Sequence, residues 1–359
     1  MPPSPSDTLT PTRRARVHPA WWAAGVAFLA LLSAAGFRAA PGALMVPLHH
    51  EFGWSTSVMS LAVSVDLVLY GLTAPFAAAL MDRFGIRQVV AAALALVALG
   101  AGGSVLMTAS WQLLIFWGVL IGLGTGSMAL VLAATIANRW FVARRGLVMG
   151  ILTAGSATGQ LVFLPPVAAL AESVGWRPAS LVVAGAALVA VPIVWAVMRD
   201  HPADRGVLPY GADPATYVAP PATVPGGATR RALEGLSYAV RRRSFWALAI
   251  AFAICGATTN GLIGIHFIPS AHDHGMATTT AAGLLAVVGV FDVLGTVASG
   301  WLTDKLDPRK LLVAYYAFRG VGLLLLPWLL ADTVHPSMVL FIVIYGLDWV
   351  ATVPPTAAL

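Results

Sequence analysis

Five charged residues interrupt the long apolar stretches of this sequence: Arg38, Asp66, Asp292, Arg319 and Asp348. Placing such a side chain at the centre of a lipid bilayer costs at least about 2.5 kcal/mol, so an ionisable group at membrane depth predicts a function or a charged partner. A carboxylate in that position can take up and release a proton, and a guanidinium can hold an anion. These residues are therefore the first candidates for a functional site.

The apolar stretches predict the helices that position these residues. Hydrophobic residues make up 58% of the 359 residues and charged residues 10%, whereas a soluble domain has about 25% charged residues. One bilayer crossing takes about 20 apolar residues in a helix. We therefore expect an all-α polytopic membrane protein with ten transmembrane helices, near residues 19–47, 57–81, 88–108, 111–137, 146–170, 179–198, 244–270, 277–303, 310–331 and 337–358.

The Lys and Arg residues predict the orientation of these helices. With the N-terminus in the cytoplasm, all of them lie in the N-terminal tail or in cytoplasmic connections except Arg38, Arg177 and Arg319. This distribution is the positive-inside pattern, and it accounts for the net charge of +6 without a nucleic-acid partner. We expect a monomeric multi-pass protein of a bacterial inner membrane, with the lipid bilayer as its surroundings.

A polar connection rich in Pro and Gly divides the chain. We expect a cytoplasmic tail at 1–18, a six-helix bundle at 19–198, a cytoplasmic linker at 199–243 with a short basic helix near 230–243, and four helices of a second bundle at 244–359. A motif after the second span, Asp82-Arg83-x-Gly85-x-Arg87, recurs after the eighth as Asp304-Lys305-x-Asp307-x-Arg309. Two related halves are typical of secondary transporters. The same spacing places the counterpart of the sixth span beyond Leu359, so we expect a second bundle that lacks two helices.

These loop motifs resemble those of the major facilitator superfamily. Glu51-Phe52-Gly53-Trp54-Ser55 and the segment from Arg139 to Gly159 are most similar to its monocarboxylate-porter branch, which includes relatives of bacterial oxalate–formate exchangers. The resemblance implies two six-helix bundles that alternate access to a central cavity. It also implies that Asp82, Arg83, Gly85 and Arg87, with Asp304, Lys305 and Arg309, form a conformational latch; the alternative for the arginines is control of topology alone.

Depth along the helices suggests partners for the buried charges. At a rise of about 1.5 Å per residue, Arg38 and Asp66 lie about 27 and 24 Å from the cytoplasmic face, so we expect them to pair. Arg319 lies at about 15 Å, nearer to Asp292 at about 18 Å than to Asp348 at about 22 Å. Each such pair could instead serve only to fix helix packing.

The resemblance also bears on the substrate. In many monocarboxylate porters the eighth span carries Asp-x3-Arg, whose arginine holds the substrate carboxylate and whose aspartate takes part in proton coupling. This chain has Asp292 with Thr296 in place of the arginine, so anion binding would rest on Arg38. Asn260 and His266 in the seventh span could face the cavity. We expect a secondary transporter of a small organic anion, foremost a monocarboxylate, by proton symport or anion exchange.

Other function classes lack their motifs. The sequence contains no Gly-x4-Gly-Lys-Ser/Thr, Gly-x-Ser-x-Gly or His-Glu-x2-His pattern, so we expect neither an ATP-driven pump nor an enzyme, and no cofactor. The run His272-Asp273-His274 lacks the further ligands of a metal site. Two alternatives remain open: a transporter of the same fold for a neutral or cationic solute, including efflux, and a non-transporting membrane sensor or partner subunit.

Overall fold

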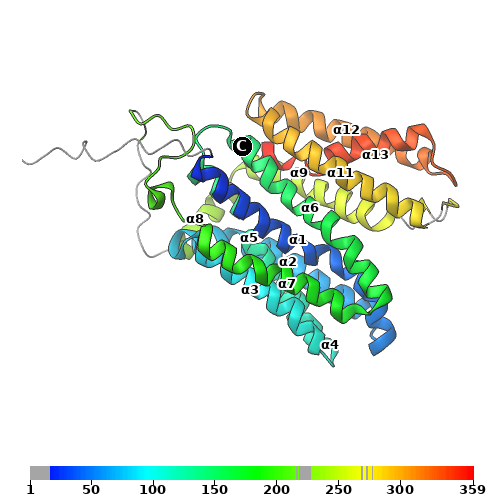
Figure 1. Cartoon of the computed structure of the whole chain (residues 1–359). Coiled ribbons are helices and arrows are strands. Elements are labelled where there is room, and N and C mark those ends of the chain that lie inside the picture. The colour runs from blue at the N-terminus through cyan, green and yellow to red at the C-terminus, as the bar shows by residue number, and fades with distance from the viewer. Residues whose placement is uncertain (1–16, 216, 218–227, 268–269, 272–273, 277) are drawn as a thin grey trace, which may run out of the picture.

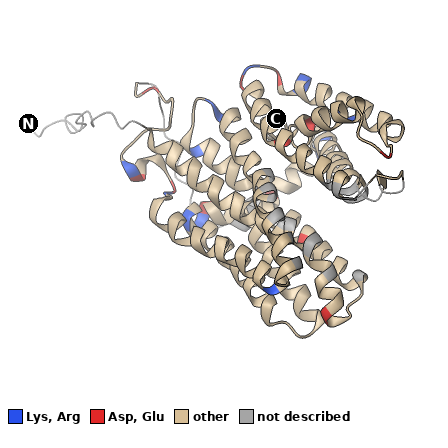
Figure 2. Cartoon of the chain, turned by 45° about the vertical axis from the view of Figure 1, so that its right-hand side comes forward, with Lys and Arg blue, Asp and Glu red and all other residues tan. Residues whose placement is uncertain are grey.

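A computed structural model describes residues 17–215, 217, 228–267, 270–271, 274–276 and 278–359. Some side chains within its helices, those of Arg38, Asn260 and His266 among them, lie outside that description. The described chain is almost entirely helical (Figure 1). Nine helices in this part of the chain are long and apolar enough to cross a membrane, and α6 occupies the remaining predicted span. Charged residues gather at the ends of the helices and leave their middles nearly free of charge (Figure 2).

The first half contains six spans. They are α1 (Pro19–Phe52), α2 (Thr56–Phe84), α3 (Ile86–Gly103) with the short η2 (Ser104–Leu106), a fourth span of three pieces, α6 (Arg145–Ser173) and α7 (Trp176–Val197). The three pieces are α4 (Ser110–Leu113), the π-helical η3 (Leu114–Ile121) and α5 (Gly122–Trp140). All six spans lie where the sequence predicts them, although α1 and α2 run several residues further than expected.

The second half begins after the connection, which contains η4 (Pro202–Arg205) and α8 (Ala228–Val240). Its spans are α9 (Arg243–Gly256) continued by the π-helical η5 (Ala257–His266), α11 (Thr278–Thr303), α12 (Pro308–Leu329) and α13 (Pro336–Asp348), followed by α14 (Val353–Ala357). The tenth predicted span is present over Pro336–Ala357, but its helix is interrupted between Asp348 and Val353. Pro354 and Pro355 explain the break, because a proline removes a helical N–H and clashes with the carbonyl one turn earlier.

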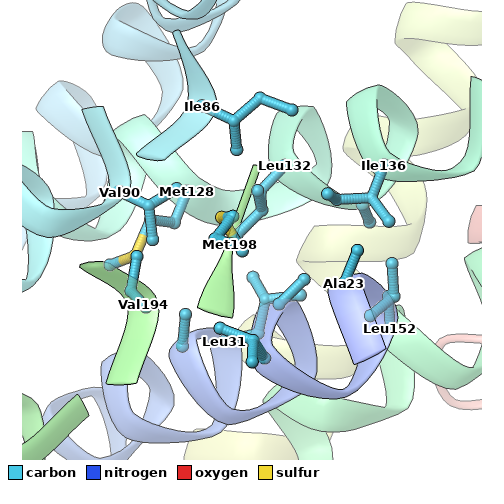
Figure 3. Close-up of a cluster of buried hydrophobic side chains, with 14 of the residues drawn as sticks. Ala23, Leu31, Ile86, Val90, Met128, Leu132, Ile136, Leu152, Val194 and Met198 are labelled. Atoms are coloured by element: carbon cyan, nitrogen blue, oxygen red, sulfur yellow. The ribbon is translucent and has the colours of Figure 1, made fainter. Parts of the chain in front are cut away.

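The core of the first half lies among α1, α3, α5, α6 and α7. Figure 3 shows Ala23 and Leu31 of α1, Val90 of α3, Leu132 of α5 and Val194 of α7 turned toward one another. Alanines on the buried face of α1 allow its neighbours to approach closely. Small residues are the usual means of packing helices in lipid, where apolar surroundings provide no hydrophobic driving force.

Glycines of α6 bring the two halves of the molecule together. An added Cβ on Gly150 would lie 2.7 Å from the Thr296 carbonyl oxygen, and one on Gly146 would lie 2.5 Å from the carbonyl oxygen of Gly300. Both partners belong to α11, so this is the principal helix contact between the halves (Figure 1). Gly155 and Gly159, one to two turns further on, pack instead against α1.

The start of the 199–243 connection is folded against the first half. The Tyr210 N–H donates to the Trp140 carbonyl (2.8 Å), and the Val142 N–H donates to the Tyr210 carbonyl (2.9 Å). Tyr210 also contacts the rings of His18 and Trp21, and Trp21 contacts Phe141. We call His18, Trp21, Phe141 and Tyr210 the aromatic clasp. It joins the connection to the beginning of α1 and to the loop between α5 and α6.

Candidate transport site and latch

Asp292 lies near the middle of α11, on the helix that contacts the other half of the molecule. Its side chain is 2% exposed. Oδ1 accepts hydrogen bonds from the Thr296 hydroxyl (2.9 Å) and from the Val350 N–H (3.1 Å), which belongs to the break in the tenth span. No Lys or Arg nitrogen among the described residues lies within 4.0 Å of this carboxylate. Asp292 is thus a buried acid held by neutral donors.

Thr296, which stands where many monocarboxylate porters carry arginine, uses its hydroxyl within its own helix. It is fully buried, and it donates to Asp292 because residues four apart lie on the same face of a helix. Its backbone carbonyl faces Gly150 of α6. The Asp292–Thr296 pair therefore lies directly beside the contact between the two halves.

Arg319 pairs with Asp348 and not with Asp292, the partner nearer in depth. Its Nε donates to Asp348 Oδ2 at 2.8 Å, and its Nη2 donates to the backbone carbonyls of Asp348 and Trp349. The estimate from depth failed because α12 packs against α13 rather than against α11. Arg319 is 2% exposed. It neutralises Asp348 and satisfies carbonyls left open where α13 ends.

Part of the predicted site lies where the structure describes no side chain. Arg38 is in α1, and Asn260 and His266 are in η5, but their side chains lie outside the described part of the structure. The predicted Arg38–Asp66 pair therefore stays a prediction. Asp66 is half-buried in α2, where its backbone packs against Gly122 of α5. Of the His272-Asp273-His274 run, the first two residues also lie outside the description.

A cavity of about 210 Å³ lies between α12 and α13. Its walls are apolar and aromatic, with Phe318, Phe341 and Tyr345 among them, and Arg319 and Asp348 close one side. All of its lining residues belong to these two helices. Because no residue of the first half contributes, this cavity does not have the position of a site that two moving halves would share.

Asp304 links the two halves at the end of the molecule where α1 begins. We call this the basic end, because most of the Lys and Arg residues that the structure describes lie there (Figure 2). The Asp304 carboxylate accepts the N–H of Gly146 (2.8 Å) and the N–H of Leu147 (2.9 Å), both in the first turn of α6. These amides lack partners within their own helix, and the helix dipole favours a negative charge beside them. Asp304 is thus an N-terminal cap supplied by the opposite half.

The matching motif in the first half contacts its own bundle and the start of the 199–243 connection. Asp82 forms an ion pair with Arg139 at the end of α5 (2.6 Å). Gly85 has φ +88°, and an added Cβ would meet the Asp200 carboxylate. Asp200 accepts the Arg87 N–H in the first turn of α3 (3.1 Å), and the Arg87 guanidinium lies over the Trp195 ring. The glycine is therefore required both by the backbone conformation and by the acid that caps α3.

The remaining residues of the predicted latch have local contacts. Arg83 lies over Phe84, and Lys305 lies over Trp301 at 3.8 Å. The Arg309 N–H is capped by Asp307. Of the latch residues, Asp304 is the one shown to contact the opposite half.

Glu51, Trp176 and Arg177 form a cluster at the opposite end of the molecule. Both carboxylate oxygens of Glu51 accept from Arg177, at 2.9 and 2.6 Å, and the Trp176 indole also donates to it. These bonds, with that to Arg177 foremost, lower the pKa of Glu51 below its ordinary value. The cluster joins the end of α1 to the start of α7.

Sequence reasoning missed several of these positions. Arg139, Asp200 and Tyr210 were not predicted to have specific partners, because each contacts a residue that is distant in the sequence. The sequence did hold a sign of the Arg177 partner. Arg177 is the one basic residue predicted in a loop outside the cytoplasm, and it follows a tryptophan at the same end of the molecule as the end of span 1. An isolated cation in that position suggests an acidic partner. Asp200 gave a weaker signal as an acid directly after a predicted span.

Comparison with known proteins agrees with this arrangement. Residues 26–359 match the Major Facilitator Superfamily. The "Uncharacterized MFS-type transporter YcxA" of Bacillus subtilis (strain 168) is 27% identical over 94% of this chain and 79% of its own length. Mouse "Monocarboxylate transporter 11" is 29% identical over 85% of this chain, which spans 64% of that protein. Among solved structures, the proton:xylose symporter XylE gives a TM-score of 0.64 at 16% identity, over 94% of this chain and 80% of that one. The family match over nearly the whole length, together with two helical halves in contact through α6 and α11, shows that this chain belongs to the Major Facilitator Superfamily.

Proposed function

We propose that the chain is a secondary active transporter of a small organic anion, foremost a monocarboxylate, that works by alternating access. The observation that carries this proposal is Asp292, a buried acid held by neutral donors beside the contact between the halves. The monocarboxylate transporters among the relatives support the substrate class. Buried ionisable groups on spanning helices commonly belong to proton or substrate pathways.

The charges of the second half favour proton symport. Arg319 and Asp348 cancel one another, so Asp292 leaves this region with one net negative charge when ionised and with none when protonated. An anion bound between the two halves, beside Asp292, would be repelled in the first state and tolerated in the second. Proton and anion would therefore bind together, which is the requirement for symport. Exchange of one anion for another remains the second form of the same mechanism.

Asp304 supplies a basis for the latch. Its contact with the first turn of α6 exists only while the halves are close at the basic end, so it favours that state. We assign the basic end to the cytoplasm from the distribution of Lys and Arg, and we place the protein in a bacterial inner membrane as a monomer. In that orientation the latch closes the cytoplasmic side.

A second candidate is a transporter of a neutral solute driven by protons. The observation in its favour is that the charge of Arg319 is already neutralised by Asp348, so it does not offer a substrate anion an uncompensated cation. Anion binding then depends on Arg38, whose side chain is not described. The same residue, Asp292, would carry the proton in both cases.

Uptake by the purified full chain in proteoliposomes tests the proposal. Formate, acetate, lactate and pyruvate would be compared with xylose, each with and without an inward proton gradient. We expect gradient-dependent uptake of at least one carboxylate, abolished in Asp292→Asn and retained in the matched control Asp213→Asn, which changes a carboxylate in the exposed connection. Uptake of xylose alone would favour the second candidate. Normal gradient-driven uptake by Asp292→Asn would exclude the role of that residue.

A further inference from the structure

Helix α8 is amphipathic and lies at the boundary of the second bundle. At about 100° per residue, Leu233, Leu236 and Val240 share one face, whereas Glu234 and Gly235 lie on the other. The three apolar residues are all exposed, with Leu233 at 52%. Although α8 packs against α2, this contact leaves the apolar face uncovered. An exposed apolar face on a strongly amphipathic helix needs a nonpolar medium or a partner.

The position of α8 relative to the membrane is fixed by its connection to α9. A turn of two residues separates Val240 from the first residue of α9, Arg243, where a membrane span also begins. Trp246 in the first turn of that span is 52% exposed, and its indole N–H donates to the Val240 carbonyl (2.8 Å). Tryptophan is typical of the interface between water and lipid. The end of α8 is thereby held at interfacial depth.

Arginines concentrate positive charge at this junction. Arg241, Arg242 and Arg243 are consecutive and exposed. The Arg242 guanidinium lies over the Tyr238 ring at 4.6 Å and donates to the Tyr238 hydroxyl. These contacts direct the Arg242 side chain along α8 and away from the apolar face. Residues 228–256 contain two further arginines and a single acid, Glu234. The net charge of this surface is therefore strongly positive.

From these observations we propose that α8 and the α8–α9 turn form a binding surface for anionic phospholipids of the adjacent leaflet. The apolar face enters the boundary of the acyl chains, and Arg241, Arg242 and Arg243 contact the phosphate-bearing headgroups. Interfacial helices bind membranes through this combination of buried apolar area and attraction to anionic lipid. A soluble acidic partner would match the arginines but would leave Leu233, Leu236 and Val240 without cover, because the turn holds them level with the start of a span.

Fluorescent labelling of the full chain tests the apolar face. In a Cys255→Ser background, an environment-sensitive dye would be attached at Leu236→Cys or, as the matched control on the opposite face, at Gly235→Cys, where an added Cβ meets nothing within 4 Å. In vesicles of phosphatidylcholine with phosphatidylglycerol, we expect the dye at position 236 to be blue-shifted and quenched by brominated lipid, and the dye at 235 to stay in water. Equal water exposure at both positions would overturn the proposal. So would shielding at 236 that depends on protein density, which would assign the face to a second copy.

Lipid selectivity tests the arginines. Lipid that copurifies from mixed vesicles should be enriched in phosphatidylglycerol over phosphatidylcholine. Each basic group near an anionic surface contributes up to about fivefold in binding, so the triple variant R241Q/R242Q/R243Q should lose most of this enrichment. R241K/R242K/R243K should keep it, since the charge is retained. An unchanged enrichment in the folded, monodisperse Gln variant, or its loss in the Lys variant, would overturn the role assigned to the charge.

Discussion

Asp304 accepts the backbone N–H of Gly146 at 2.8 Å, and this bond joins residues from the two halves of the molecule. The contact requires glycine at position 146, because an added Cβ there would lie 2.7 Å from the Asp304 carboxylate. It also requires the short side chain of aspartate at position 304. Gly300 and Gly150 bring the helices equally close one turn further along. The cap and the glycine contact therefore stabilise the same closed arrangement at the basic end.

Replacing Asp304 with Ala should shift the molecule toward states that are open at the basic end. Loss of a helix cap costs about 0.5–2 kcal/mol, which changes the ratio of two states by about twofold to thirtyfold. Spin labels on the first turn of α6 and the last turn of α11 would report the change as a growing population at longer distance. Asp307→Ala is the matched control, since Asp307 caps α12 within its own half. Equal distance distributions in both variants would exclude Asp304 as a latch.

Gly300 should not tolerate a side chain, whereas Gly283 on the same helix should. An added Cβ at Gly300 would lie 2.4 Å from the Gly146 carbonyl oxygen, and one at Gly283 meets nothing within 4 Å. We expect Gly300→Ala to lower the thermal midpoint and the rate of uptake, because the backbones of α6 and α11 must separate. Gly283→Ala should match the parent protein in both measurements. Comparable behaviour of the two variants would show that the close contact is dispensable.

The Arg319–Asp348 pair should stabilise the fold without contacting substrate. Removing one partner of a buried ion pair costs about 3–5 kcal/mol, so Arg319→Met and Asp348→Asn should each lower the thermal midpoint strongly. The double variant should lose less than the sum of the two, because no uncompensated charge remains. Uptake per folded molecule should keep its KM. A rise in KM in Arg319→Met, with the fold intact, would instead assign this guanidinium to anion binding.

Periodicity and charge predicted most of this fold, and the limits of that prediction have a physical cause. The ends of α7, α11 and α12 follow from apolar length, since a bilayer crossing needs a minimum number of residues. The partner of Arg319 did not follow from depth, because depth along a helix axis does not say which neighbour a side chain faces. Asp304 was predicted as part of a latch, but its partners could not be predicted. It accepts hydrogen bonds from backbone amides of α6, and every residue except proline has such an amide, so the sequence of α6 does not identify them. Asp200 and Tyr210 find their partners because the start of the 199–243 connection is folded against the first half. Its composition, rich in Pro and Gly, predicted only a linker.

The aromatic clasp should loosen as the pH falls below about 6.5. His18 Nδ1 accepts the Ala20 N–H at the start of α1, which requires the neutral ring, and burial lowers the pKa of His18 from its ordinary value of 6.5. His18 in the open clasp has the ordinary pKa and therefore binds a proton more readily than His18 in the closed clasp. Above pH 6.5 both forms are neutral and the closed clasp keeps its full stability. As the pH falls from 6.5 toward the lower pKa of the closed form, protonation of the open form favours opening. Hydrogen exchange at the Tyr210 and Val142 amides should therefore be faster at pH 5.5 than at pH 7.5, after correction for the intrinsic rate. His18→Asn keeps a side chain suited to a helix cap but does not titrate, so its protection should be the same at both pH values. A pH effect of equal size in that variant would show that another group controls the clasp.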